Sequence, residues 1–152
     1  MEIIRQKHPE VKNLRDCTFQ LLDLIQDPII YQRCRYVLEE NLRVIQGSVN
    51  LEAGDLEAFG NKMYLSHQGL SQQYEVSCPE LDLLVSYTQG KDAVLGSRMM
   101  GGGFGGCTIN IIQKENKEEV CQRILQAYQD QTGIEGEAYF VQPKNGVELL
   151  EK

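Results

Sequence analysis

Six of the 14 glycines in this chain of 152 residues fall between Gly96 and Gly106, in the segment GSRMMGGGFGGC. A run this dense loses much backbone entropy on folding, so the folded state must require it. Two glycines are enough for the positive φ angles of a β-turn, whereas five in six residues indicate that other backbone or a ligand comes very close. The segment therefore favours a phosphate or substrate loop over a purely structural turn.

Three phosphate-loop templates differ from this segment. A P-loop places Lys-Ser or Lys-Thr after its last glycine, whereas Cys107 and Thr108 stand there. The pattern Gly101-x-Gly103-x-x-Gly106 formally fits the dinucleotide-binding motif, but that motif opens a helix and the residues from Thr108 on alternate like a strand. The glycine loop of protein kinases does lie between strands, but its partner motifs V-A-I-K, H-R-D and D-F-G are absent from this sequence.

The first two thirds of the chain predict helices, because apolar residues recur there at helical spacing. One helix is expected over 14–25, ended by the Asp-Pro pair at 27–28, and a longer one from 34 to about 52, ended by Gly54. Asp55 is expected to cap a third helix over 56–70, and Ser77 with Glu80 forms a capping box for a fourth. The face expected to be buried on the second helix consists of Cys34, Val37, Leu38, Asn41, Val44 and Ile45.

The last third of the chain predicts strands. Strands are expected over Ala93–Met99, Cys107–Ile112 and Glu137–Val141, the last closed by Pro143. Between the second and third, Asn116 opens a helix that Gly133 ends. Helices followed by a β-β-α-β order predict a single α+β domain over 1–152, with helices packed on a mostly antiparallel sheet.

Charge and cysteine content narrow the partners and the location. The chain has 15 Lys and Arg against 22 Asp and Glu, a net charge of −7, so we expect no binding to nucleic acid or to a membrane. No apolar run approaches a membrane span and the N-terminus lacks a signal peptide. The odd number of cysteines, five, without a C-x-x-C pair indicates reduced thiols in a cytoplasmic protein.

Few side chains outside the glycine segment qualify for chemistry. Arg98 is placed to reach a phosphate, but pairing with an acidic neighbour is favoured. Ser97 is expected either to donate to a ligand or to interrupt the strand, and the sequence does not separate the two. His67 is expected to be a hydrogen-bonded, partly buried histidine, and Asn41 a satisfied interior amide. No catalytic residue and no metal ligand is assigned.

The glycine segment closely resembles the C-terminal glycine-rich motif of the GHMP small-molecule kinases, and specifically that of the galactokinase family. Upstream, Ser66-His67, Leu70 and the run YEVSCPELD from Tyr74 resemble the segment that precedes this motif in galactokinases. The stretches NLRD from Asn13 and RYV from Arg35, with Glu40-Asn41 and Arg43, also match, so the resemblance covers most of the chain. One departure is Met100, where the family usually has Thr.

The resemblance implies an α+β, ferredoxin-like C-terminal domain of a kinase that phosphorylates galactose to galactose 1-phosphate with ATP and Mg²⁺. In this family the active site lies between two halves, and the N-terminal half carries the sugar motif, a phosphate loop and the catalytic Asp and Arg. Those motifs are absent here, so we expect a C-terminal fragment that is inactive alone, with Mg²⁺ and most ATP contacts supplied by the other half. The residues expected to line the phosphate site are Gly101, Gly102, Gly103, Phe104, Gly105 and Gly106, supported by Ser97 and Arg98.

Other interpretations stay open at this point. Within the same family, an N-acetylgalactosamine kinase fits the same motifs, because the sugar-contacting residues lie upstream. A galactose-sensing relative without catalysis would keep this domain but carry a defective phosphate loop in its other half. An independent structural module is the remaining alternative. A fragment would also expose an apolar or glycine-rich face and self-associate through it.

Overall fold

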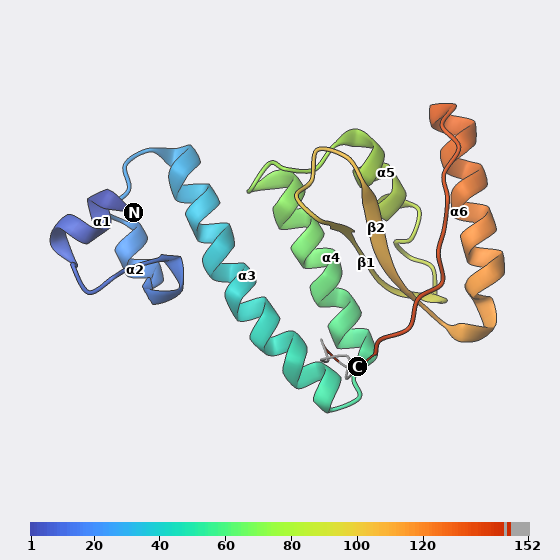
Figure 1. Cartoon of the computed structure of the whole chain (residues 1–152), viewed down its shortest axis with the longest axis horizontal. Coiled ribbons are helices and arrows are strands. Elements are labelled where there is room, and N and C mark those ends of the chain that lie inside the picture. The colour runs from blue at the N-terminus through green and yellow to red at the C-terminus, as the bar shows by residue number, and fades with distance from the viewer. Residues whose placement is uncertain (145, 147–152) are drawn as a thin grey trace, which may run out of the picture.

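Helices flank a two-stranded antiparallel sheet in the computed structural model, which describes residues 1–144 and 146 (Figure 1). The elements run α1 (Glu2–Lys7), a 3₁₀ helix (Leu14–Asp16), α2 (Phe19–Leu22), α3 (Pro28–Glu52), α4 (Leu56–Gln72), α5 (Pro79–Ser86), β1 (Val94–Met100), β2 (Cys107–Ile112), a second 3₁₀ helix (Lys114–Asn116) and α6 (Lys117–Thr132). The predicted α+β class with an antiparallel sheet is confirmed.

The helix ends follow from local side-chain chemistry. The Asp27 carboxylate accepts from the N–H groups of Ile29 and Ile30 at 2.9 and 3.0 Å, so the Asp-Pro pair that ends one segment also starts α3. Asp55 caps α4 by accepting from the Ala58 N–H at 2.9 Å, as expected. Gly133 ends α6 at a φ of 71°, a left-handed conformation that favours glycine.

Two helix predictions need correction. The helix expected over 14–25 is split into a 3₁₀ turn and the four-residue α2, with Cys17 extended between them. The capping box expected at Ser77 and Glu80 does not form: Cys78 is the N-cap of α5, and the Ser77 hydroxyl donates to Asp82 at 2.5 Å instead. The carboxylate of Asp82, five residues further along the chain, therefore replaces the backbone N–H as the partner of this hydroxyl.

The sheet is smaller than the sequence predicts. β1 and β2 pair in register from Met100↔Cys107 back to Val94↔Ile112, with an irregularity between Val94 and Gly96. Residues 137–141 form no strand, so the expected third strand is wrong. This segment instead runs along α6 (Figure 1), where the Lys117 ammonium lies 4.8 Å from the Phe140 ring. The side chains of Tyr139 and Val141 are 78 and 76% exposed. The alternation of residue types in this segment therefore does not correspond to burial against a sheet.

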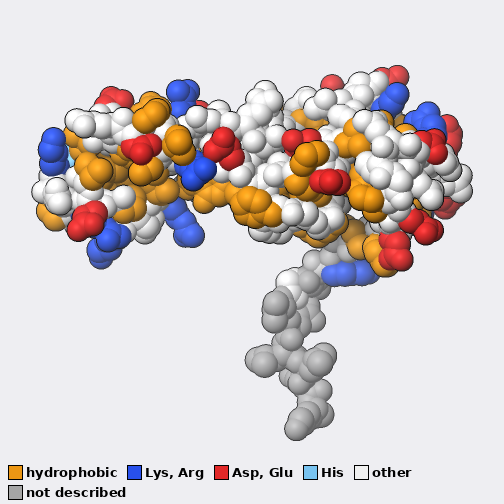
Figure 2. Space-filling view, turned by 90° about the horizontal axis from the view of Figure 1, so that it is seen from above, with side chains coloured by type: hydrophobic (Ala, Val, Ile, Leu, Met, Phe, Trp, Pro, Cys, Tyr) orange, Lys and Arg blue, Asp and Glu red, His pale blue; other side chains and the backbone are white. Residues whose placement is uncertain are grey.

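Two hydrophobic clusters form at different places along α3. The first joins α3 to the N-terminal segment and consists of Ile4, Val11, Leu22, Ile25 and Leu38. The second joins α3, α4, α5 and β1 and consists of Tyr36, Leu70, Leu81 and Met99. In Figure 2 the N-terminal residues accordingly form a lobe of their own, connected to the rest of the chain. The sheet and the glycine segment belong with the second cluster.

The C-terminal half of α3 exposes apolar side chains that the sequence pattern would bury. Val44 and Ile45 are 65 and 63% exposed, against the prediction. Asn41 is half-buried rather than interior. Leu42, Ile45 and Val49 recur at helical spacing on one side of α3, and we call these three the α3 apolar face, whereas the exposed Val44 and Leu51 lie on another side of the helix. Helical spacing predicts that these apolar side chains are buried, but no described segment of the chain packs over them.

No helix within residues 1–144 has both the length and the apolar composition to cross a membrane.

Candidate functional site

The glycine segment forms the connection between β1 and β2, over residues 101–106, which we call the glycine loop. Five of its residues have φ angles in the left-handed region: Gly101 (85°), Gly103 (85°), Phe104 (61°), Gly105 (138°) and Gly106 (103°). L side chains rarely adopt such φ angles, so backbone conformation alone requires four of these glycines. This corrects the expectation that a turn would need only two.

Gly103 is required for a second reason, because other backbone lies close to it. A Cβ atom on Gly103 would lie 2.0 Å from the Val76 carbonyl oxygen. The same oxygen accepts a hydrogen bond from the Phe104 N–H at 2.7 Å. The loop therefore rests on the segment between α4 and α5, which contains the first five residues of the YEVSCPELD run; the other four belong to α5.

The loop presents backbone donors to its surroundings. Among the described residues outside the two strands, none accepts a hydrogen bond from the other five loop N–H groups. Gly101, Gly102 and Gly106 are exposed, and so is the Phe104 side chain, at 77%. Unpartnered N–H groups on successive residues of unusual φ form a concave anion site in many proteins. The loop therefore has the chemistry to bind phosphate oxygens.

Phe104 is the one loop residue with a side chain, and its left-handed φ angle is unfavourable for that side chain. Left-handed φ costs an L residue with a large side chain about 1–2 kcal/mol. The exposed ring regains none of this through burial. Strain of this kind is concentrated at functional sites, so the exposed ring supports the assignment of the loop to a binding site.

His67 anchors the end of β1 next to the loop. Its Nδ1 accepts from the Met99 N–H at 3.2 Å, and its Nε2 lies 3.1 Å from Asp82 Oδ1. The ring therefore carries its proton on Nε2, which donates to the carboxylate. His67 is 6% exposed, so the predicted hydrogen-bonded, buried histidine is confirmed. Burial lowers the pKa of His67, which the Asp82 carboxylate opposes and Arg98 reinforces.

This lowered pKa predicts a pH dependence of stability. Below about pH 6.5 the His67 ring binds a proton in the unfolded chain but much less in the folded chain, because its pKa is lower there. The free energy of unfolding therefore falls on acidification, by at most about 1.4 kcal/mol per pH unit. Urea unfolding at pH 7.5, 6.5 and 5.5 measures the slope. His67→Asn should flatten it, whereas His8→Asn, at a half-exposed histidine, should leave the His67 contribution in place. Equal slopes for wild type and His67→Asn would contradict the assignment.

Arg98 joins an ionic cluster instead of pointing freely to solvent. Its Nη1 lies 3.2 Å from Glu40 Oε1, while the other carboxylate oxygen is 2.8 Å from Arg43 Nε. The Ser66 hydroxyl also donates to Glu40, at 2.5 Å. The acidic partner expected for Arg98 is therefore present, and Glu40 ties α3 to both α4 and β1.

Two further residues of β1 differ in their relation to the loop: Ser97 lies inside the protein, whereas Met100 lies next to the loop. Ser97 is fully buried, and its hydroxyl finds no hydrogen-bond partner among residues 1–144 and 146. Met100 is 49% exposed at the last position of β1, opposite Cys107. A threonine hydroxyl at this position would stand beside the loop, so its loss changes the polarity of the loop base.

Metal-binding and thiol chemistry have little support in the described part of the chain. Residues 1–144 and 146 contain no group of three His, Cys, Asp or Glu side chains arranged to hold a metal ion. All five cysteines are free thiols. Burial raises the pKa of Cys17, Cys34 and Cys121, which keeps those thiols protonated and unreactive.

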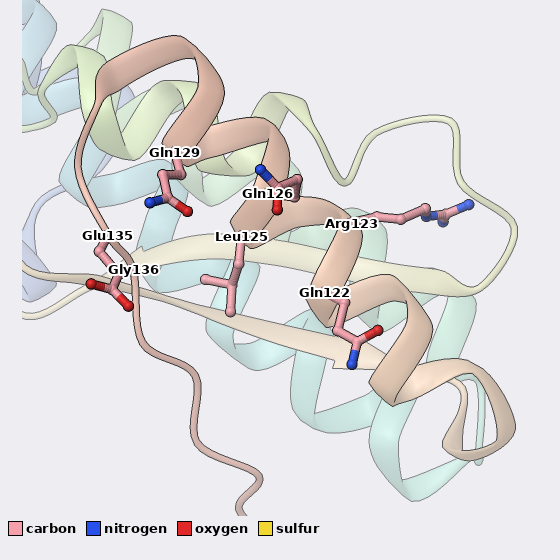
Figure 3. Close-up of a pocket in the computed structure, with 7 residues that line it drawn as sticks. All are labelled: Gln122, Arg123, Leu125, Gln126, Gln129, Glu135 and Gly136. Carbon is pink, nitrogen blue, oxygen red and sulfur yellow. The ribbon is translucent and has the colours of Figure 1, made fainter.

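A cavity of about 510 Å³ lies away from the glycine loop. Figure 3 shows it between α6, which contributes residues such as Gln122 and Gln129, and the following segment at Glu135 and Gly136. Amide side chains dominate its wall, and no loop residue lines it. The cavity was not predicted from the sequence, and its lining contains no pair of groups suited to proton transfer.

Sequence reasoning missed three residues that hold the site together. Val76 carries the carbonyl on which the loop rests, Glu40 binds Arg98, and Asp82 binds His67. Each partner is 15 or more positions away along the chain, so no local spacing connects them. The signal that was available is the YEVSCPELD motif, which contains both Val76 and Asp82.

Residues 48–130 match the profile of the family described as GHMP kinases C terminal. A protein of Roseiflexus sp. (strain RS-1), named galactokinase, is 37% identical over 147 residues, which cover 95% of this chain and 38% of that protein. The galactokinase of Clostridium acetobutylicum is 39% identical over 131 residues, 86% of this chain and 34% of that protein.

A solved structure shows the same likeness in three dimensions. The crystal structure of Lactococcus lactis galactokinase complexed with galactose matches with a TM-score of 0.80 and 32% identity. The match covers 87% of this chain and 35% of that one. The chain thus spans only about a third of the length of the proteins it resembles.

Proposed function

This chain belongs to the GHMP kinase family, whose C-terminal domain it carries, and we propose that it forms the C-terminal part of a galactokinase. Such an enzyme transfers the γ-phosphoryl group of ATP to the O1 hydroxyl of galactose, with Mg²⁺. Support comes from the relatives named galactokinase and from the similarity to a galactokinase crystallised with galactose. The free thiols are compatible with a cytoplasmic enzyme.

The observation that carries the proposal is the unpartnered donor set of the glycine loop. Phosphoryl transfer depends on positioning and on stabilising charge on the phosphoryl oxygens. Loop N–H groups that have no partner among the described residues outside the two strands would bind those oxygens, and the absence of side chains at five of six positions lets the loop approach them closely. Arg98 would add positive charge near the loop base, at 3.2 Å from its partner Glu40.

We propose further that this chain supplies one wall of the active site and no catalytic base. The His67 imidazole is occupied on both nitrogens, by the Met99 N–H and Asp82. The described residues also hold no metal-ligand cluster, so the donors present fit phosphate but not Mg²⁺. The base and the Mg²⁺ ligands would come from the portion that the relatives carry outside the matched segment. The isolated chain should therefore be inactive.

The α3 apolar face is where we expect that portion to dock. Three apolar side chains on one side of α3, each 48 to 63% exposed, form a patch and are not scattered single residues on an ordinary monomer surface. In the isolated chain the same face should drive self-association. Sedimentation that shows a strict monomer at high concentration, or unchanged behaviour after Ile45→Asp, would count against this surface.

A fusion protein tests the proposed function. The portion of the Roseiflexus galactokinase outside the matched segment is placed before Met1, and ADP formation is measured with galactose and Mg-ATP. We expect turnover from the fusion and none above background from the isolated chain. Turnover by the isolated chain would show that it contains its own catalytic groups. A folded fusion that binds ATP without turnover would contradict the proposal that this chain completes the active site of a kinase.

The sugar itself depends on residues outside this chain. The fusion inherits its sugar site from the Roseiflexus portion, so it does not separate galactose from N-acetylgalactosamine. Sequencing the codons before Met1 decides this point. An intact phosphate loop and a catalytic Asp there would support an enzyme, and the sugar motif would identify its substrate.

A further inference from the structure

The Asp82 carboxylate on α5 collects three donors from two other segments. It accepts from the Ser77 hydroxyl at 2.5 Å and from the His67 ring at 3.1 Å on Oδ1, and from the Ser71 hydroxyl at 2.9 Å on Oδ2. Ser71 and His67 lie on α4, whereas Ser77 lies on the segment between α4 and α5. One side chain therefore joins α4, α5 and the intervening segment.

Two of these donors lead directly to the glycine loop. His67 accepts from the N–H of Met99, two residues before the loop begins. Ser77 follows Val76, whose carbonyl accepts from the N–H of Phe104 in the middle of the loop. Asp82 is thus connected to both backbone attachments of the loop. It reaches the first through the His67 imidazole and the second through Ser77, which adjoins Val76.

The loop needs such external support because it has almost none of its own. Five of its six residues are glycines, which contribute no side-chain packing and lose the most entropy on ordering. The Phe104 ring is exposed. A phosphate site works only if its donors are already in place, since misplacement of about 1 Å costs large factors in rate.

We propose that Asp82 is a positioning residue for the glycine loop, acting through His67 at the loop's first attachment and through Ser77 and Val76 at its second. This proposal rests on the proposed function for its kinetic consequence, but its structural part concerns this chain alone. Asp82 does not touch substrate in this scheme. It fixes the loop from behind, where its side chain is 44% exposed in a cavity of about 400 Å³ between α4 and α5.

Amide exchange in the isolated chain tests the structural part. In Asp82→Ala, exchange of the Met99 and Phe104 N–H groups should both rise on the order of 10-fold, the value of about one hydrogen bond. Asp82→Asn keeps the acceptor oxygen and donates to Ser71, so it should restore most of the protection. Ser77→Ala removes one connection and should accelerate Phe104 but not Met99. Asp130→Ala, an exposed carboxylate on α6, is the control and should change neither.

Kinetics of the fusion protein test the consequence for the reaction. Asp82→Ala should lower kcat at least about 10-fold while KM for galactose stays within about twofold, because the sugar contacts lie elsewhere. Asp82→Asn should recover most of kcat. Unchanged exchange at Met99 and Phe104, or equal kcat for the Ala and wild-type fusions, would overturn the proposal. An inactive wild-type fusion would contradict the proposed function instead, and the exchange data would still decide the role of Asp82.

Discussion

Replacing Gly60 by alanine is expected to lower the free energy of unfolding by about 3 kcal/mol, the upper range for overpacking a core. A Cβ on Gly60 would lie 1.8 Å from the Leu95 carbonyl oxygen and 2.3 Å from its carbon. These are backbone atoms of β1, which no rotamer change moves away. Helix α4 and β1 would therefore have to separate, and Met99 and Leu70 of the second cluster would lose contact.

The sign of this effect is diagnostic. Helix propensity alone predicts that alanine is about 1 kcal/mol better than glycine inside α4. Urea unfolding or a melting curve, with an expected drop of roughly 10 °C, measures the difference. Gly102→Ala is the matched control, since a Cβ there has nothing within 4 Å and its φ is not left-handed. A Gly60→Ala chain as stable as wild type would show that α4 and β1 are not in backbone contact.

Local sequence predicted those elements whose ends are set by a neighbouring side chain. Asp55 starts α4 and Gly133 ends α6, each through contacts within four residues. Both strands of the hairpin were placed within a residue or two, because alternation and the glycine run mark them. The strand over 137–141 failed, since alternation predicts a strand only where a partner edge exists.

The candidate site was predicted from the sequence only where a local pattern marks its residues. The loop residues follow from glycine density, and the buried state of His67 follows from its place on a helical stripe. Neither Asp82 nor Val76 stands out locally: Ser77 with Glu80 fits a capping box, yet the hydroxyl bonds to Asp82. The contacts that attach the loop form only when α4 and α5 pack together. They join residues at no regular spacing along the chain, so no sequence pattern predicts them.

Three glycines lie against other backbone, and they serve two purposes: Gly60 and Gly96 face each other between α4 and β1, whereas Gly103 lies against Val76. Gly60 sets the distance between α4 and β1, so it supports the whole domain. Gly103 sets the distance between the loop and Val76 at the surface. A change at the first should appear mainly in stability, whereas a change at the second should appear mainly in catalysis.

Gly103→Ala is therefore expected to reduce kcat of the fusion protein by about 100-fold, the cost of a catalytic group displaced by about 1 Å. Its Cβ would lie 2.0 Å from the Val76 oxygen, at a φ of 85°. The loop would lift off Val76 and lose the 2.7 Å bond from the Phe104 N–H, while the core beneath stays packed. Unfolding should become only about 1–2 kcal/mol easier, the cost of one left-handed alanine.

Gly90→Ala separates strain from loop displacement. Gly90 has a similar φ of 68° but nothing within 4 Å, and it lies before β1, at the strand end remote from the loop. The substitution should cost the same left-handed strain and leave kcat unchanged. Equal kcat for Gly103→Ala and Gly90→Ala would mean that contact with Val76 does not position the loop. A loss confined to Gly103→Ala would establish that the loop acts in catalysis through its fixed backbone, because the substitution removes no functional side chain.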